Sequence, residues 1–325
     1  MSSLNKNMRI VFMGVPQFAV STLESLIING FNVVGVVTSP DKPAGRGRKL
    51  HRSAVKEFAE LHSIPVLQPD NLKNTEFLGA LKNLKGDTFI VVAFRKLPEE
   101  VWKMPAMGTI NLHASLLPNY RGAAPINHVI VNGETQTGVT TFFINDKIDT
   151  GNILLREELP ISASENAGEL HDRMAKTGAS LMIKTLSGIA DNSVKPQAQS
   201  SFITDEANLK TAPKIFPKDC IIDWNMEATR ICNFVRGLSP LPGARSSFKN
   251  NDGSLSFKIL ECHAGHEEHN LPAGTISSDG KHYIKIACKD GFINVVNLQV
   301  EGRKKMDTAE FLRGFRISGY TIESN

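Results

Sequence analysis

The chain has 325 residues, 41% of them apolar, a length that suggests two domains, and no apolar run approaches the roughly 20 residues needed to cross a bilayer. Its 37 Lys and Arg residues against 33 Asp and Glu residues give a net charge of +4, which excludes a histone-like protein and leaves any nucleic-acid surface to local clusters. The first residues, MSSLNKN, lack the apolar stretch of a secretory signal, so we expect a cytoplasmic protein that does not engage a membrane.

Strand and helix patterns alternate in the first part of the chain. Residues 8–14 form a short apolar run that ends in glycine, and helical spacing follows until Gly30, which predicts a strand, a tight turn and a helix. The pattern then repeats, with strands predicted at 31–38, 65–67 and 87–94 and helices at 53–62 and 72–84. This alternation is typical of a mostly parallel, doubly wound, Rossmann-like α/β sheet, in which ligands bind beyond the carboxyl ends of the strands.

The remaining predicted elements complete this sheet and then change in character. They are a strand at 108–114, a helix at 126–132, a strand at 137–144, a further strand and a long helix at 167–189. Residues 191–213 lose periodicity and have the composition of a linker, and short alternating segments between Asp-Gly turns follow them. We expect a first domain at 1–190, a linker at 191–205 and a smaller, OB-like β-barrel domain at 206–325.

Two polar residues mark the end of the strand predicted at 108–114. Asn111 and His113 are two apart, so their side chains leave the same face of the strand. An amide can donate to the oxyanion of a tetrahedral intermediate, and an imidazole can stabilise that charge or move a proton. Asp149, in a later loop, could approach His113, and the first domain has no Cys and no GxSxG nucleophile. Spacing alone does not separate this acyl-transfer role from a structural one.

A longer string around these residues carries a resemblance. NLHASLLPNYRGAAPI at 111–126, followed by IDTG at 148–151, is similar to the signature of the 10-formyltetrahydrofolate-dependent formyltransferase superfamily. The resemblance implies transfer of a formyl group from 10-formyltetrahydrofolate to an amine, with Asn111, His113 and Asp149 as the catalytic set and no metal. It also implies folate contacts, which we expect from Ser115, Leu116, Leu117, Pro118, Val92, Phe94 and Leu97. Arg95 departs from the glycine usual in this superfamily.

Further segments narrow the resemblance. TSPDKPAGRGRKL at 38–50 resembles the loop with which methionyl-tRNA formyltransferases approach the acceptor end of initiator tRNA, and TAPKIFPKDCIIDWN at 211–225 resembles the start of their C-terminal domain. The chain is therefore similar to that family from about residue 9 onward. The implied reaction is direct attack of the α-amino group of methionyl initiator tRNA on the formyl carbon. We expect the protein to be a monomer.

The charge of the loop agrees with an RNA partner. Residues 41–52 carry five Lys and Arg residues against one acid, and two glycines give the backbone freedom to reorganise around phosphates. Taken alone, such a run is more typical of a solvated, mobile loop. Beside the predicted site, it indicates RNA contact, and we expect tRNA contacts from Lys42, Arg46, Arg48, Lys49, Lys210 and Lys214.

Other functions share parts of these patterns. A nucleotide-sugar amine formyltransferase or a formyltetrahydrofolate hydrolase would carry the same signature, although neither is expected to carry a PAGRGRK-like loop. A non-catalytic folate- or RNA-binding module is a third alternative, which the intact catalytic set disfavours. Cys262, His263, His266 and His269 lack the spacing of a metal site, and we interpret them as a coincidence.

Overall fold

The computed structural model describes residues 7–44, 49–203, 205–251 and 253–322. The chain divides into two compact units. Unit 1 comprises residues 1–122, 136–160 and 171–211, and unit 2 comprises residues 123–135, 161–170 and 212–325. Unit 2 therefore includes two short segments that precede its main part, residues 212–325, in the chain. In the described residues, no helix combines the length and the apolar character that crossing a membrane requires.

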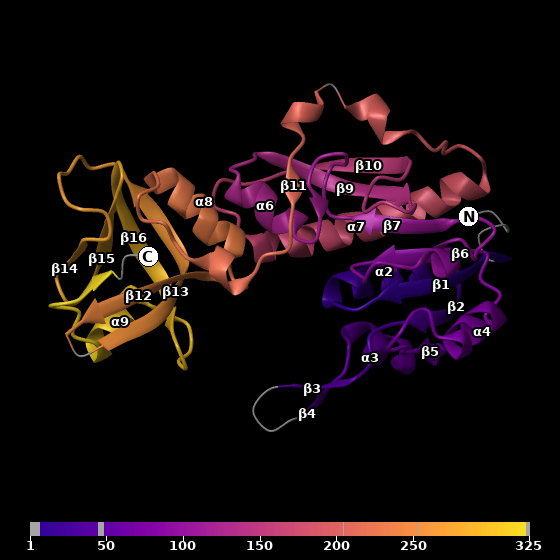
Figure 1. Ribbon diagram of the computed structural model, residues 1–325, viewed down its shortest axis with the longest axis horizontal. Helices are drawn as coiled ribbons and strands as arrows, with labels where there is room; N and C mark the ends of the chain where they lie inside the picture. The colour runs from indigo at the N-terminus through magenta and orange to yellow at the C-terminus, as the bar shows by residue number, and fades with distance from the viewer. Residues whose placement is uncertain (1–6, 45–48, 204, 252, 323–325) are drawn as a thin grey trace. The chain divides into compact units, whose positions relative to one another are not determined.

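Unit 1 is built on one large sheet (Figure 1). Its strands are β1 (Arg9–Gly14), β2 (Asn32–Val37), β5 (Val66–Leu67), β6 (Thr88–Val92), β7 (Thr109–His113), β9 (Gln136–Phe143) and β10 (Ile153–Pro160). Their order across the sheet is β10-β9-β7-β6-β1-β2-β5. The strands β5, β2, β1, β6 and β7 are parallel, β9 pairs antiparallel with β7, and β10 pairs antiparallel with β9. The predicted mostly parallel, doubly wound sheet is confirmed.

Helices cover both faces of this sheet. They are α2 (Gln17–Ile28), α3 (Ala54–Leu61), α4 (Thr75–Asn83), α5 (Glu99–Trp102) and α7 (Ala167–Ala190). On one face, Phe77 of α4 and Val101 of α5 share a core with Val11 and Val91. On the other face, α7 approaches β7 so closely that a Cβ at Gly178 would lie 2.7 Å from the Leu112 side chain. Both sheet faces are therefore buried, which explains the continuously apolar strand sequences.

Local signals explain where the elements of unit 1 begin. Ser53 caps α3 by accepting a hydrogen bond from the Lys56 backbone N–H, and Asn74 caps α4 in the same way. Gly14 ends β1 because a Cβ there would lie 2.7 Å from the Ala19 Cβ and 2.9 Å from the Val92 oxygen. The close approach of backbone segments at this turn therefore requires glycine.

The basic loop includes a two-stranded hairpin, β3 (Lys42–Ala44) and β4 (Lys49–His51), which extends away from the sheet of unit 1 (Figure 1). Its neck is closed by a buried hydrogen bond of 2.7 Å between the hydroxyls of Thr38 and Ser53. Asp41 adds an ion pair of 2.7 Å with Lys56 and accepts a hydrogen bond from Gln68. The base of the hairpin is thus firmly attached to unit 1.

Residues 191–213, which lose periodicity in the sequence, contain short elements of their own. They are η1 (Gln199–Phe202), η2 (Glu206–Asn208) and β11 (Thr211–Ala212), which pairs with β8 (Arg121–Gly122). Gln197 exchanges two backbone hydrogen bonds of 2.8 Å with Ile153, and Phe202 packs against Leu117 and Phe142. The part of this segment with linker composition is therefore anchored to unit 1.

Unit 2 contains an antiparallel, barrel-like sheet. Its strands are β12 (Ala244–Asn250), β13 (Gly253–Gly265), β14 (Ile276–Ser278), β15 (Ile284–Cys288), β16 (Gly291–Val300), β17 (Met306–Asp307) and β18 (Thr321–Ile322). The order is β14-β15-β16-β13-β12-β18, and β17 pairs with β16. The predicted β-barrel in the C-terminal part of the chain is confirmed.

Helices and a short turn complete unit 2. They are α6 (Pro125–Val131), η3 (Pro217–Cys220), α8 (Ala228–Leu238) and α9 (Thr308–Gly314). The sequence analysis did not predict α8, although its buried residues Ala228, Ile231, Val235 and Leu238 follow helical spacing. Gly237 of α8 lies against Val131 of α6, so this pair of helices packs closely.

Candidate functional site

The first component of the site is the carboxyl end of β7. Asn111 and His113 lie there as predicted, His113 buried at 7% exposure and Asn111 partly exposed. The Asn111 carboxamide makes no hydrogen bond to another residue in the described part of the chain. Its donor is therefore available to a ligand oxygen.

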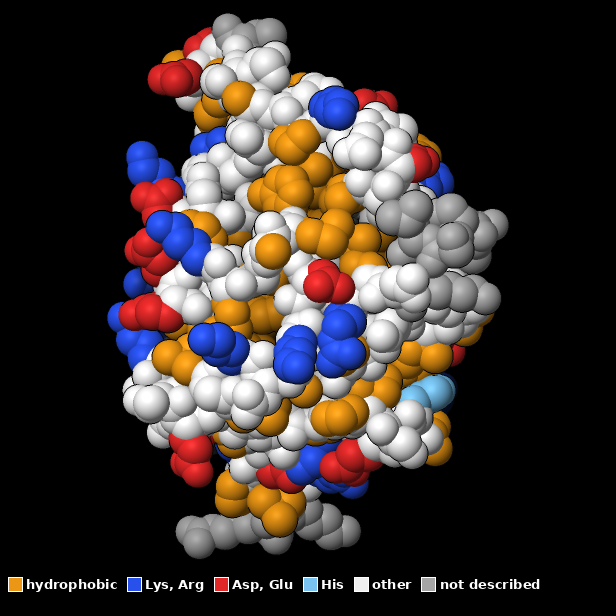
Figure 2. Space-filling view, turned by 90° about the vertical axis from the view of Figure 1, so that its right-hand side faces the viewer, with side chains coloured by type: hydrophobic (Ala, Val, Ile, Leu, Met, Phe, Trp, Pro, Cys, Tyr) orange, Lys and Arg blue, Asp and Glu red, His pale blue; other side chains and the backbone are white. Residues whose placement is uncertain are grey.

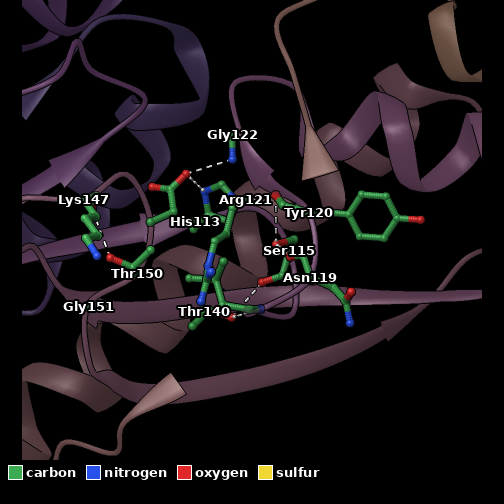
Figure 3. Close-up of polar contacts among 12 residues, drawn as sticks. His113, Ser115, Asn119, Tyr120, Arg121, Gly122, Thr140, Lys147, Thr150 and Gly151 are labelled. Carbon is green, nitrogen blue, oxygen red and sulfur yellow. Dashed lines mark hydrogen bonds and ion pairs between the residues drawn. The ribbon is translucent and has the colours of Figure 1, made fainter. Parts of the chain in front are cut away.

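The imidazole of His113 is oriented by the backbone of a following turn (Figure 3). Its Nε2 lies 2.9 Å from the carbonyl oxygen of Tyr120, and its Nδ1 lies 3.8 Å from Oδ2 of Asp149. A carbonyl oxygen only accepts hydrogen bonds, so Nε2 carries a proton in either charge state of the ring. Nδ1 is therefore the nitrogen that gains or loses a proton, and it faces the carboxylate.

The loop between β9 and β10 brings Asp149 to His113. Asp149 has a positive φ of 53°, and its Oδ2 accepts a hydrogen bond of 2.9 Å from the backbone N–H of Gly122. Within the loop, Thr150 Oγ1 donates to Asn145 Oδ1 at 3.0 Å. The carboxylate is thus held where it can stabilise an imidazolium at His113.

The turn at 115–120 supports this arrangement. The Ser115 hydroxyl donates a hydrogen bond of 2.7 Å to the backbone carbonyl oxygen of Asn119, and Thr140 Oγ1 donates one of 2.7 Å to the backbone carbonyl oxygen of Ser115 (Figure 3). Tyr120 has a positive φ of 59°, which directs its carbonyl to His113. Of the expected folate contacts in this turn, the buried ones are Ser115, Leu117 and Pro118, whereas Leu116 is partly exposed.

The other expected folate contacts lie at the end of β6 and after it. Val92 and Leu97 are buried, Phe94 is partly exposed, and Ala93 between them has a positive φ of 48°. Arg95 is exposed, and its guanidinium donates to the carbonyl oxygen of Asp70 at 2.7 Å and to that of Pro69. The arginine that replaces the expected glycine is therefore bound to a neighbouring loop.

Two polar residues near the site were not predicted. Gln199, which is 4% exposed, donates from Nε2 to the carbonyl oxygens of Asp149 and Gly151, each at 2.9 Å. Its Oε1 accepts from Arg121 Nε at 3.1 Å and from Arg121 Nη2 at 2.5 Å. A glutamine in a segment rich in Ser, Gln and Pro offers no sequence signal for such a role.

The expected tRNA contacts are dispersed along the chain. Lys42 is exposed on β3, Lys210 is exposed in unit 1, and Lys214 is exposed in unit 2 with its Nζ 5.4 Å from the ring centroid of Phe216. Arg46 and Arg48 lie outside the described residues, as does the side chain of Lys49. On the face in Figure 2, basic and acidic side chains intermingle along one side, so no uniform positive surface appears there.

Unit 2 has a cavity of about 620 Å³ over the outer face of its sheet. Arg245 and Lys258 are cross-strand partners on its floor, Lys258 pairs in register with Gln299, and Pro217 and Ile221 contribute an apolar wall. Nε of Arg245 is buried and has no hydrogen-bond partner among the described residues. The cavity thus has the basic residues Arg245 and Lys258 in its lining, together with the acidic residue Glu301. The sequence analysis missed it because these residues are far apart in the chain.

The His and Cys residues of β13 and the following loop do not gather. His269 Nε2 lies 2.7 Å from the Gly291 oxygen, and in the described ranges no three His, Cys, Asp or Glu side chains form a group that could hold a metal ion.

Comparisons with known proteins agree along most of the chain. A family model described as formyl transferase matches residues 8–186, and one described as formyl transferase, C-terminal domain, matches residues 214–316. The methionyl-tRNA formyltransferase of Bacteroides thetaiotaomicron is 49% identical over 319 residues, which cover 98% of this chain and 99% of that protein. The methionyl-tRNA formyltransferase of Flavobacterium johnsoniae is 51% identical over 313 residues, 96% of this chain and 98% of that protein.

Solved structures share the fold at lower identity. A sugar 3N-formyl transferase has a TM-score of 0.62 and 23% identity, covering 91% of this chain and 99% of that one. HypX from Aquifex aeolicus in complex with tetrahydrofolic acid has a TM-score of 0.63 and 19% identity, covering 96% of this chain and 48% of that one. At these identities the likeness concerns the fold alone.

Proposed function

The chain belongs to the formyl transferase family, and on this premise we propose that it transfers the formyl group of 10-formyltetrahydrofolate to the α-amino group of methionyl initiator tRNA. The observation that carries the proposal is the pair of His113 and Asp149 beside the unbonded amide of Asn111. The near full-length similarity to methionyl-tRNA formyltransferases supports the identity of the acceptor.

The three polar residues have distinct roles in this reaction. The amine attacks the formyl carbon, the carbonyl electron pair moves to oxygen, and the Asn111 amide donates a hydrogen bond to that oxyanion. The attacking nitrogen then loses one proton, and N10 of the folate gains one as its bond to the formyl carbon breaks. Nδ1 of His113 moves this proton, because Nε2–H is bound to the Tyr120 carbonyl. Asp149 orients the imidazole, stabilises its charged form and orders water for the transfer.

The folate-binding wall is formed by Val92, Phe94, Leu97 and the turn at 115–118. Phe94 and Leu116 are the partly exposed apolar side chains of this set, so they contact the pterin ring of the folate. The buried members, Val92, Leu97, Ser115, Leu117 and Pro118, fix the backbone behind them. The Ser115 hydroxyl contributes through its hydrogen bond to Asn119 rather than to the ligand.

The tRNA contacts come from the basic hairpin and from unit 2. Lys42, Arg46, Arg48 and Lys49 of the basic sequence at 41–52 bind the phosphate backbone, which positions the acceptor end without reading its sequence. Lys210 and Lys214 add phosphate contacts, as do Arg245 and Lys258 in the cavity over the barrel-like sheet. The apolar wall of Pro217 and Ile221 allows a sugar or base to lie beside the bound phosphate.

The reaction also implies where the protein acts. Aminoacylated tRNA is a cytoplasmic substrate, so we place the enzyme in the cytoplasm. We propose that it works as a monomer, since one chain supplies both the formyl-transfer residues and the basic residues. Sedimentation of the protein with and without tRNA measures this directly, and a stable dimer in both conditions would contradict it.

One assay separates the candidate functions. Formyl-labelled 10-formyltetrahydrofolate is incubated with the protein and with methionyl initiator tRNA, a nucleotide-sugar amine, or water alone. We expect label on the methionyl-tRNA, and its loss in the His113→Ala variant. Faster transfer to the sugar amine, or hydrolysis as the main reaction, would replace the proposal by one of those activities. Folate or RNA binding without turnover would indicate a non-catalytic module.

A further inference from the structure

A single buried side chain, Gln199, connects two parts of the site that are 28 residues apart in the chain, namely Arg121 and Asp149. Its amide nitrogen donates to the carbonyl oxygens of Asp149 and Gly151, and its oxygen accepts from the Arg121 guanidinium. All of its polar atoms are therefore used, inside unit 1 and at 4% exposure. Neither the formyl-transfer mechanism above nor the folate contacts assign a role to this residue.

The contacts of Gln199 form a closed ring around the Asp149 carboxylate. Gln199 holds the backbone of Asp149, and the Asp149 side chain accepts from the N–H of Gly122 at 2.9 Å. Gly122 follows Arg121, whose guanidinium returns to Gln199. The position of the carboxylate relative to His113 is thus determined through two connections, and Gln199 takes part in both.

The loop at 149–151 needs such support because its backbone conformation is unusual. Asp149 has a φ of 53°, in the left-handed region that a residue with a side chain adopts only when its surroundings hold it there. Gly151 lies so close to β9 that a Cβ there would come within 1.6 Å of the Phe143 oxygen. The carboxamide nitrogen of Gln199 carries two hydrogens, so it can donate to the carbonyls of residues 149 and 151 at the same time.

Gln199 is itself rigidly placed. Gln197 pairs with Ile153 through two backbone hydrogen bonds, and Phe202 packs into the cluster of Leu117, Phe142 and Ile153. The Arg156 guanidinium carbon also lies 4.0 Å from the centroid of the Phe202 ring. The segment that carries Gln199 can therefore restrain the loop, rather than follow it.

We propose that Gln199 is a positioning residue for formyl transfer. It acts by holding the Asp149 carboxylate so that it faces Nδ1 of His113. This inference rests on the proposed function, because it assumes that the pair of His113 and Asp149 moves the proton. It predicts that the chemical step depends on the carboxamide of Gln199, whereas the binding of folate and tRNA does not.

The variant Gln199→Glu isolates this role. The side chain keeps its shape and an acceptor for Arg121, but it loses both donated hydrogen bonds and turns a negative charge toward two carbonyl oxygens. We expect kcat to fall by about tenfold to a hundredfold, with KM for each substrate within about twofold of wild type. The matched control is Gln197→Glu, the same change on an exposed side chain two residues away, which should leave kcat unaltered.

A double-mutant cycle tests the route through Asp149. If Gln199 acts through that carboxylate, Gln199→Glu should change kcat less than about twofold in an Asp149→Ala background. An equal loss in both backgrounds would overturn the proposal, as would wild-type kcat in Gln199→Glu alone. Should Gln199→Glu fail to fold, Gln199→Met keeps the volume without a charge, and the same two outcomes decide. Absence of formyl transfer by the wild-type protein would instead contradict the proposed function, so the two failures are distinguishable.

Discussion

His113 presents Nδ1 to the Asp149 carboxylate at 3.8 Å because its other ring nitrogen is bound to the backbone oxygen of Tyr120 at 2.9 Å. Nε2 fixes the orientation of the ring through its hydrogen bond to the backbone, and Nδ1 faces the Asp149 carboxylate. The positive φ of Tyr120 and that of Asp149 bring these two partners to opposite sides of the ring. Unusual backbone at both residues therefore serves the orientation of one imidazole.

Removal of the His113 imidazole should lower the turnover rate strongly and leave folate binding intact. In His113→Ala, we expect kcat for formyl transfer to fall by about a hundredfold to ten-thousandfold, because a positioned acid–base group is lost. The dissociation constant for folate, measured by fluorescence or calorimetry, should change little, because the folate wall lies in other residues. Wild-type turnover in this variant would refute the role of His113.

Charge on the hairpin should affect tRNA more than folate. Lys42→Gln should raise KM for methionyl-tRNA several-fold and reduce the salt dependence of binding by about one phosphate contact. Lys176→Gln is the control, an exposed lysine on α7 in the same unit. Equal effects of Lys42→Gln on both substrates would count against tRNA contact by the hairpin.

The cavity of unit 2 should contribute to tRNA binding independently of the active site. The variants Arg245→Gln and Lys258→Gln should each weaken tRNA binding and lower the salt slope by about one, with kcat and folate KM unchanged. Lys281→Gln provides the control, because Lys281 is an exposed lysine in the turn before β15 of the same unit. Binding is measured by filter retention at several salt concentrations, and wild-type slopes would exclude a phosphate in this cavity.

A turn in unit 2 should make folding sensitive to acid. The pKa of Asp279 is lowered, mainly by hydrogen bonds from the backbone N–H groups of His282 and Lys281, from a usual value of 3.8. A depressed folded-state pKa contributes stability that is present above the unfolded pKa and lost as pH falls through the folded value. Asp279→Ala should therefore lower Tm at pH 5, and the difference from wild type should shrink as the pH falls below 4. A difference that grows in acid would contradict this sign.

Local sequence patterns were sufficient for the elements that bury both faces of the sheet in unit 1. Strands with continuous apolar runs and helices with capping residues such as Ser53 and Asn74 were predictable because these signals lie within a few residues of each other. The same holds for Asn111 and His113, whose spacing of two puts them on one face of β7. Helix α8 was overlooked although its apolar spacing is present in the sequence.

The sequence by itself determined the fold class, the shared face of Asn111 and His113, and the resemblance that named their chemistry. Only the tertiary structure decided which ring nitrogen of His113 is free, which residue holds the Asp149 loop and where Arg245 meets Lys258. The reason is physical. Periodicity reports which side of an element is buried, whereas hydrogen bonds between residues such as Gln199 and Asp149 depend on backbone positions 50 residues apart, which leave no local trace.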